Sequence, residues 1–421
     1  MRASQQLSLV GFLLFFLLPA HLCEICEASN EQQASLAPLM ATMIQSRQPS
    51  PEADSSILIA LELARQYDQK AETAFLNVVK QNILQRETLT SGQLALIILA
   101  LTAACQTSFV AEYKLVKSLE EKFQKEIDSI DTSGQPLTNY YELGLDVLAL
   151  CLLNGTYSSS KIAKLFSAEQ RMSYISGQFF VDTGALAVLA LTCVNRQSPD
   201  KIISKNILWL VEKILKEKKQ DGTIGDIYST GEAMQALFVT PEYYKKEAWD
   251  CNQTLNTVLS QISQGTFSLP IAAAQVLPAL EGKTYLDVTH VSCQSRPAGH
   301  LNISTPKPTE PTHQSKNISV TYSVVDSINN NINESTIISV PKDSVFLKVM
   351  EAAQAQNYSK FWFTIESSEW GAYVTSVHGI QASSKNRTYW ELLNNHQPLS
   401  QGAGSFVVSD GDNLEVRLSQ Y

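Results

Sequence analysis

The sequence predicts a multidomain protein in which an all-helical domain, an α6/α6 toroid, precedes a small α+β domain. Three observations predict this organisation. An apolar helical pattern recurs through residues 57–280, a proline-rich break follows the last cysteine, and the patterning beyond that break changes to a period of two. The 421 residues, 44% of them hydrophobic, are enough to build more than one buried core.

The first residues are typical of an export signal. Arg2 supplies a positive start, and an apolar run from Leu7 to Leu18 ends before Pro19. This run is too short for a transmembrane helix, and no later stretch is long and apolar enough to be one. We therefore expect the chain to begin with a signal peptide and the protein to be secreted, without membrane insertion. The residues allow cleavage after Ala20, whereas the family resemblance described below implies cleavage after Cys23, with residues 1–23 as the signal peptide.

Six apolar, alanine-rich stretches recur roughly every 40 residues, a spacing that accommodates two helices and their turns. They lack a polar stripe, so each should be buried on most sides, and the amphipathic stretches between them suit an outer layer. A closed toroid over residues 24–294 follows, with an open solenoid as the alternative. The apolar stretches are 57–64, 94–105, 145–153, 183–194, 231–238 and 272–280.

The composition changes after Cys293. Residues 295–316 contain four prolines and no apolar periodicity, which predicts a glycosylated linker. The following segments KNISVTYSVV, SKFWFTIE and WGAYVTSVHGI alternate as strands, and SVFLKVMEAAQ is typical of a helix. The segment SFVVSDGDNLEVRL predicts a hairpin that turns at Asp410–Asp412. Residues 317–421 should therefore form the small α+β domain.

Cysteines and sequons both suit an exported protein. If Cys23 leaves with the signal, six cysteines remain, and an even count in an exported chain predicts three disulfides whose pairing the spacing leaves open. Seven Asn-x-Ser/Thr sequons, five of them between residues 302 and 386, predict a glycosylated surface. The sequons are at Asn154, Asn252, Asn302, Asn317, Asn333, Asn357 and Asn386.

Charge and motif content exclude several functions. The net charge is −9 and there is no run of Lys and Arg, so nucleic acid is not an expected partner. Nucleophile-elbow, zinc-protease, phosphate-loop and dinucleotide motifs are all missing from the sequence. No histidine lies in the helical stretches, and we expect no histidine-based acid–base or metal chemistry in the helical domain. The sequence therefore predicts a protein without a catalytic cofactor that is not an enzyme.

Polar residues recur where the inner helices should begin. Taken singly, each is explained as a helix cap worth about 1 kcal/mol. If the inner helices run parallel in a toroid, however, their N-termini share one rim, which suits a ligand rich in amide and hydroxyl groups. Thr90 and Gln93 form a capping box, and the sixth helix should begin at Pro270. The other polar residues at these helix starts are Thr138, Asn139, Tyr141, Glu142, Asp182, Ser229, Thr230 and Gln275.

Two aromatic segments of the strand domain offer a second surface. Residues 370–374 and 390–399 place large aromatic and aliphatic groups close together in a small domain. Such a domain cannot bury all of them, so we expect some to face outward and to contact a ligand.

At this level of detail the chain resembles the cobalamin transport proteins, the intrinsic factor–transcobalamin–haptocorrin family. The resemblance rests on SGQLALIILAL, PLTNYYELGLDVLALCL, VDTGALAVLALTC, YSTGEAMQAL, AAAQVLPALEGKTYLDV, TYWELL and PLSQGAGSF, which occur in family order. It extends from about Cys26 to Tyr421. The opening CEICE, the many sequons and Phe179 in QFFVDTGA are most similar to the haptocorrin branch.

The resemblance implies a fold and a function. The implied fold is an α6/α6 toroid with a small β-rich domain that closes over a corrin, held by the disulfides Cys26–Cys251, Cys105–Cys293 and Cys151–Cys193. The implied protein is a secreted carrier that binds cobalamin and related corrinoids with high affinity between its domains, for transport and protection. We expect it to be a monomer, with a clearance receptor as its protein partner.

The resemblance also assigns ligand contacts. Asp226 stands where relatives commonly have Asn, and Glu142 stands where they commonly have Gln. Phe179 occupies a position from which some members offer a histidine to cobalt, so we expect no protein side chain on the metal. The implied contacts are Gln93, Thr138, Tyr141, Glu142, Asp182, Asp226, Ser229, Gln275, Trp370, Gly371, Tyr373, Val374, Trp390, Leu392, Pro398 and Leu399.

Two other hypotheses about the function are consistent with a helical toroid. An α/α-toroid glycosidase would use Asp182 and Asp226 as its carboxylate pair, which requires the carboxylates to lie roughly 5–9.5 Å apart. A complement-like thioester domain would share the helical toroid but requires a Cys-x-x-Gln segment, which the sequence lacks.

Overall fold

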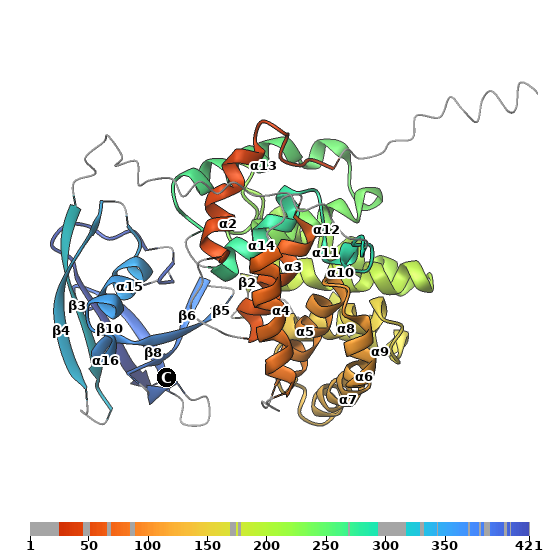
Figure 1. The fold of residues 1–421 in the computed structure, drawn as a ribbon, viewed down its shortest axis with the longest axis horizontal. Coiled ribbons are helices and arrows are strands. Elements are labelled where there is room, and N and C mark those ends of the chain that lie inside the picture. The colour runs from red at the N-terminus through yellow and green to blue at the C-terminus, as the bar shows by residue number, and fades with distance from the viewer. Residues whose placement is uncertain are drawn as a thin grey trace, which may run out of the picture. The chain divides into compact units, whose positions relative to one another are not determined.

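The structure is a computed structural model (Figure 1). It describes residues 25–44, 51–64, 69–84, 89–168, 174–175, 178–267, 270–293, 317–328, 332–342, 344–368, 371–378, 380–382, 388–399, 402–404 and 406–420. The chain divides into two compact units, Met1–Leu301 and Asn302–Tyr421, which we describe separately. The predicted signal peptide and the predicted linker lie outside the described residues.

The first unit is a closed ring of helices. Its inner helices pack against one another in chain order, and the last, α14, packs against the first, α3. The ring therefore closes: the predicted toroid is confirmed, and the open solenoid is wrong. The inner helices are α3 (Pro51–Leu63), α5 (Ser91–Ala103), α8 (Tyr140–Leu152), α10 (Val181–Gln197), α12 (Thr230–Phe238) and α14 (Pro270–Leu280).

The outer helices follow from an amphipathic pattern. Along α7 the buried apolar residues Leu115, Leu119, Phe123 and Ile127 lie on one face, whereas nearly every residue of α5 is buried. At least one outer helix lies between each pair of consecutive inner helices, so the inner helices run parallel to one another. The outer helices are α2 (Ala37–Ile44), α4 (Gln69–Leu84), α6 (Thr107–Glu112), α7 (Leu115–Ser133), α9 (Ser159–Leu165), α11 (Lys201–Lys216) and α13 (Cys251–Ser263).

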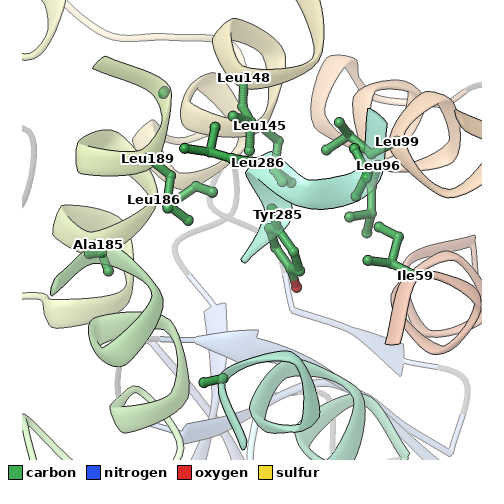
Figure 2. Close-up of a cluster of buried hydrophobic side chains, with 14 of the residues drawn as sticks. Ile59, Leu96, Leu99, Leu145, Leu148, Ala185, Leu186, Leu189, Tyr285 and Leu286 are labelled. Atoms are coloured by element: carbon green, nitrogen blue, oxygen red, sulfur yellow. The ribbon is translucent and has the colours of Figure 1, made fainter. Parts of the chain in front are cut away.

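The chain beyond α14 fills the centre of the ring. The short helix η5 (Tyr285–Thr289) contacts α3, α5, α8 and α10. Figure 2 shows Tyr285 and Leu286 among leucine side chains of these inner helices. The Tyr285 backbone N–H donates to Gln235 Oε1 of α12 at 3.0 Å. Because the middle of the ring is packed core, a large ligand has to bind at a rim.

Three disulfides close the helical unit, with the pairing that the resemblance implies: Cys26–Cys251, Cys105–Cys293 and Cys151–Cys193. Cys151 and Cys193 lie near the C-terminal ends of α8 and α10, and Cys105 follows α5. Two of the three bonds therefore link segments at the rim where the inner helices end, opposite the rim where they begin.

The second unit is an α+β fold. Among the described residues, one sheet has the order β4-β3-β10-β8-β9, with β3 and β10 parallel, and a second has the order β5-β6-β7. Helix α15 (Phe346–Gln356) packs on β3 and β4, and α16 (Tyr358–Phe361) follows it. The strands are β3 (Asn317–Asp326), β4 (Asn333–Pro341), β5 (Phe363–Ser368), β6 (Gly371–Val377), β7 (Ile380–Gln381), β8 (Thr388–Asn394), β9 (Gln397–Pro398) and β10 (Asn413–Gln420).

The predicted C-terminal hairpin is wrong. The turn exists, with Gly411 at φ +84° and the Ser409 N–H donating to Asp412 Oδ2 at 2.7 Å. The residues before it do not pair with β10, because Val407 instead forms an isolated bridge with Val345. Strand β10 pairs with β3 and β8, so contacts distant in sequence displaced the local hairpin.

Candidate functional site

Hydrogen bonds between helix starts show that the inner helices begin at one rim. Thr90 Oγ1, before α5, donates to Glu142 Oε2 of α8 at 2.5 Å. Tyr141 of α8 donates to Glu232 Oε1 of α12 at 2.6 Å, and Gln275 Nε2 of α14 lies 3.5 Å from the Tyr141 hydroxyl. Side chains from four inner helices therefore meet at one rim, called here the polar rim, and it gathers amide, hydroxyl and carboxyl groups.

The first part of the polar rim lies between α5 and α8. The predicted capping box is confirmed: the Thr90 N–H donates to Gln93 Oε1 at 2.9 Å, and the Gln93 N–H donates to Thr90 Oγ1 at 3.1 Å. Glu142 Oε2 also accepts from the Gly92 N–H at 3.2 Å. A Cβ added at Gly92 would lie 2.5 Å from Glu142 Cβ, so the glycine permits this close approach. Glu142 therefore binds the N-terminus of α5, where a negative charge is favourable.

Thr138 is positioned from the outer layer. Glu126 of α7 is buried, and its Oε2 accepts from the Leu137 N–H at 2.7 Å and from the Thr138 N–H at 3.2 Å. Its Oε1 accepts from Ser91 Oγ at 3.2 Å. One buried carboxyl group thus anchors both the start of α5 and the loop that enters α8.

Asp182 lies in the first turn of α10 and is not its cap, which corrects the prediction that it precedes the helix. The N-cap is Phe180, which makes no side-chain capping bond. Asp182 Oδ1 accepts from the Thr183 N–H at 2.7 Å. Burial, with a smaller contribution from Asp226, raises the pKa of Asp182 to about 6.

The loop before α12 corrects a second capping prediction. Ser229 occupies the N-cap position but makes no capping bond, and its hydroxyl donates to the Ile224 carbonyl at 2.9 Å. The Thr230 hydroxyl donates to the Asp226 carbonyl at 2.5 Å. Asp226 Oδ1 accepts from the N–H groups of Tyr228 and Ser229, each at 2.8 Å. The side chains of Asp226, Ser229 and Thr230 therefore bond to backbone groups of their own loop. These bonds fix the shape of the loop and leave the side chains unavailable for capping α12.

Glu232 is a rim residue that the sequence patterns did not single out. It lies in the first turn of α12 and is 2% exposed, with Tyr141 donating to its Oε1. Burial, and after it the charge of Asp182, raises the pKa of Glu232 to about 8, although the bond from Tyr141 opposes the shift. Burial and Glu232 together raise the pKa of Tyr141 well above its usual value. A glutamate inside the mostly apolar stretch GEAMQALF was the available signal.

Phe179 is a buried aromatic residue close to Asp182. It ends the short strand β2 (Gln178–Phe179), which pairs with β1 (Tyr174–Ile175), and it is 6% exposed. A Cβ added at Gly184 would lie 2.5 Å from the tip of its ring, so the ring rests against the first turns of α10. Its side chain has no lone pair with which to bind a metal.

A histidine of the helical unit lies outside its six apolar stretches. His290 follows η5 and is exposed, with Nδ1 3.2 Å from Thr289 Oγ1. It precedes Cys293, whose disulfide partner Cys105 lies at the rim opposite the polar rim. Among the described residues, no cluster of three or more His, Cys, Asp or Glu side chains could hold a metal ion.

The predicted contacts in the second unit divide into exposed and buried residues. Tyr373 is 38% exposed and Pro398 is also exposed, whereas Val374 and Trp390 are buried. The Trp390 Nε1–H donates to the Ile380 carbonyl at 3.0 Å, so this tryptophan packs as core. Leu392 and Leu399 are half-buried, Gly371 begins β6, and Trp370 lies outside the described residues. Ligand contact by this group stays a prediction.

The sequons stay predictions as well. Asn154, Asn252, Asn317 and Asn333 are exposed, as glycan attachment requires, and Asn357 is half-buried. Asn302 and Asn386 lie outside the described residues.

A closed helical toroid with one polar rim, joined to a small β-rich unit, defines a ligand-binding protein built on the α6/α6 fold. A family model described as eukaryotic cobalamin-binding protein matches residues 8–315, and the chain belongs to that family. A model described as a domain of unknown function matches residues 343–420. The carrier resemblance and the predicted fold class are thereby confirmed.

Similar proteins support the same assignment. Transcobalamin-1 from Homo sapiens is 49% identical, over 100% of both chains. Cobalamin binding intrinsic factor from Mus musculus is 36% identical, over 94% of each chain. A crystal structure of haptocorrin in complex with Cbi (cobinamide) is 47% identical with a TM-score of 0.74, covering 94% of this chain and all of that one. Within the part of this chain that the structure describes, no helix combines the length and hydropathy needed to cross a membrane.

Proposed function

We propose that this protein is a secreted carrier that binds one molecule of cobalamin, or of a related corrinoid, and does not transform it. The observation that carries the proposal is family membership over almost the whole chain, together with a polar rim built at the starts of the inner helices. Secretion is supported by the signal-like first residues, by the sequons and by three disulfides.

The chemistry of the polar rim suits the amide groups around a corrin ring. Gln275 offers a side-chain amide, Thr138 and Tyr141 offer hydroxyls, and Asp182 offers a half-buried acceptor. Neutral hydrogen-bonding groups at a partly dehydrated surface select for shape and for amide direction. This arrangement supports direct contact between the ligand and the residues that the family resemblance selects.

The second unit supplies the other part of the proposed site. We assign its contacts to residues 370–374 and 390–399, so that the ligand joins the two units. A tether between two weak surfaces raises their effective concentration, which tightens binding without new contacts. The carrier is expected to be a monomer, with a clearance receptor as its protein partner.

The glycosidase alternative has less support. A glycosidase would need the carboxyl groups of Asp182 and Asp226 as its catalytic pair. Asp226 Oδ1, however, already accepts from two backbone N–H groups of its own loop. The relatives of this chain are named as cobalamin-binding proteins. A purified protein that hydrolysed oligosaccharides and did not bind cobalamin would reverse this choice.

The test is a titration of the purified full-length protein with aquocobalamin, followed by the visible spectrum. We expect saturation at one ligand per chain. The bound cobalt should keep a water-ligated spectrum because Phe179 cannot coordinate it, and Phe179→His should shift the spectrum toward imidazole ligation. An imidazole-type spectrum from the wild type would point to His378 or His396 and contradict this account of the metal. No binding at all would contradict the carrier function.

A further inference from the structure

A buried carboxyl group supports the polar rim from behind. Glu232 belongs to an inner helix and is almost fully buried, and Tyr141 donates to its Oε1 at 2.6 Å. Among the described residues its Oε2 has no hydrogen-bond partner, although it too is buried. A buried polar atom without a partner costs free energy, so its presence requires an explanation beyond packing.

Glu232 determines which hydrogen bonds Tyr141 can make. Because the Tyr141 hydroxyl gives its only hydrogen to Glu232, its oxygen is left solely as an acceptor. Gln275 Nε2 approaches that oxygen at 3.5 Å, within reach of a weak donor contact. One N–H of Gln275 is thereby directed to Tyr141, and within the described part of the chain its remaining N–H and its Oε1 are available to a ligand. The three residues come from α12, α8 and α14, so they join three inner helices.

We propose that Glu232 is a positioning residue of the ligand site, which fixes the Tyr141 hydroxyl as an acceptor and through it orients Gln275 toward the amide groups of the ligand. This inference rests on the proposed function, since the ligand is the corrinoid assigned above. Glu232 itself does not touch the ligand.

The groups around Glu232 make this role dependent on pH. It faces Tyr141 from α8, Asp182 from α10 and Tyr285 from η5, and Asp182 in turn interacts with Asp226. With a pKa of about 8, Glu232 is neutral at pH 7. Its ionisation above that value places a second negative charge beside Asp182, and repulsion between the two carboxylates should distort the rim. Release of the ligand should therefore quicken as the pH rises through about 8.

The experiment measures dissociation of bound cobalamin from the full-length protein after a chase with excess ligand. Glu232→Leu removes the acceptor for Tyr141, and dissociation should quicken roughly fivefold, the effect of one ordinary hydrogen bond. Glu232→Gln restores an acceptor oxygen and should bring the rate back toward the wild-type value. In a Tyr141→Phe background, Glu232→Leu should add nothing further. The matched control is Glu281→Gln, which alters a buried carboxyl beyond the C-terminal end of α14.

Each outcome decides the inference. A full additional effect of Glu232→Leu in the Tyr141→Phe background would overturn it, as would a Glu232→Gln variant as fast as Glu232→Leu. If Glu232→Leu does not fold, the pH dependence of cobalamin dissociation from Glu232→Gln decides. A dissociation rate that stays constant from about pH 7 to pH 9, while that of the wild type rises, supports the role. Parallel pH profiles of the two proteins overturn it. A wild-type protein that binds no cobalamin would contradict the proposed function instead.

Discussion

Two sectors of the polar rim use buried and half-buried carboxyl groups in opposite ways. In the α5/α8 sector, Glu126 and Glu142 accept from backbone N–H groups and hydroxyls at helix starts. In the α10/α12 sector, Asp182 and Glu232 face one another, and among the described residues Glu232 Oε1 accepts from Tyr141 while its Oε2 has no partner. A carboxyl group that accepts several hydrogen bonds stabilises the fold. A carboxyl group with few donors is available to shape a ligand site.

The largest effect should come from removing the best-satisfied carboxyl. Glu126→Ala leaves the Leu137 and Thr138 N–H groups and the Ser91 hydroxyl without their acceptor, and both Glu126 and Ser91 are buried. The free energy of unfolding should fall by about 3 kcal/mol, measured by chemical denaturation without ligand. Glu121→Ala, at an exposed position of the same helix, is the control and should cost less than about 0.5 kcal/mol. Equal losses in the two variants would contradict the comparison.

The α10/α12 sector should make stability depend on pH through Glu232. The folded protein keeps the Glu232 proton up to a pKa of about 8, whereas the unfolded chain releases it near the ordinary value of about 4.3. The stability from this proton is therefore complete below about pH 4 and is lost as the pH rises through about 8.

Glu232→Gln isolates that contribution. Relative to the variant, the wild type should lose about 1.4 kcal/mol of unfolding free energy for each pH unit between about pH 5 and pH 7. Asp182 titrates in the same range but is common to both proteins, so its contribution cancels. Denaturation curves of the two proteins at matched pH values measure the difference, and a constant offset would contradict the shifted pKa.

Asp182 should affect the ligand more than the fold. Asp182→Asn keeps an acceptor for the Thr183 N–H and removes a charge that burial disfavours. Cobalamin should dissociate about tenfold faster, as expected for loss of a charged hydrogen bond, while the thermal stability of the ligand-free protein barely changes. The reverse pattern, a large loss of stability with unchanged dissociation, would place Asp182 in the structural sector.

The smallest effect should come from Glu142→Gln. The amide oxygen can still accept from Thr90 and Gly92, so the variant loses the charge at the N-terminus of α5 and the exposed bond from Asn139 Nδ2 to Oε1. The unfolding free energy should fall by about 0.5 kcal/mol, with little change in cobalamin dissociation. A dissociation rate that rises as much as in Asp182→Asn would show that Glu142 contacts the ligand, as the family resemblance implies.

Much of the helical unit was predictable because its signals are repeated and strong. The apolar stretches correspond to inner helices, the sixth begins at Pro270, and Thr90 caps α5. The strand unit was less predictable, since β10 pairs with β3 and β8 rather than with its sequence neighbour. Pairing between distant strands depends on the whole sheet, which local alternation does not encode.

In the candidate site, too, features set by local sequence were predictable and contacts between distant residues were not. Tyr141 and Gln275 are identifiable from their places near helix starts and from the family resemblance, but the bond that links them to Glu232 is not. The capping predictions for Asp182 and Ser229 were wrong for different reasons: Asp182 lies inside the first turn of α10, whereas Ser229 occupies the N-cap position of α12 but its hydroxyl donates to the Ile224 carbonyl. Where a helix begins, and which backbone groups lie nearest to the side chain at its start, together decide whether that side chain caps the helix.

The sequence by itself determined that this chain builds a toroid of helical hairpins and belongs with the cobalamin carriers, because repeated apolar periodicity and family motifs are local properties. Only the tertiary structure decided which carboxyl groups hold the helix starts and which lack donors. That distinction depends on the neighbours that ring closure brings around each side chain, as when Tyr141 and Glu232, distant along the chain, meet at 2.6 Å.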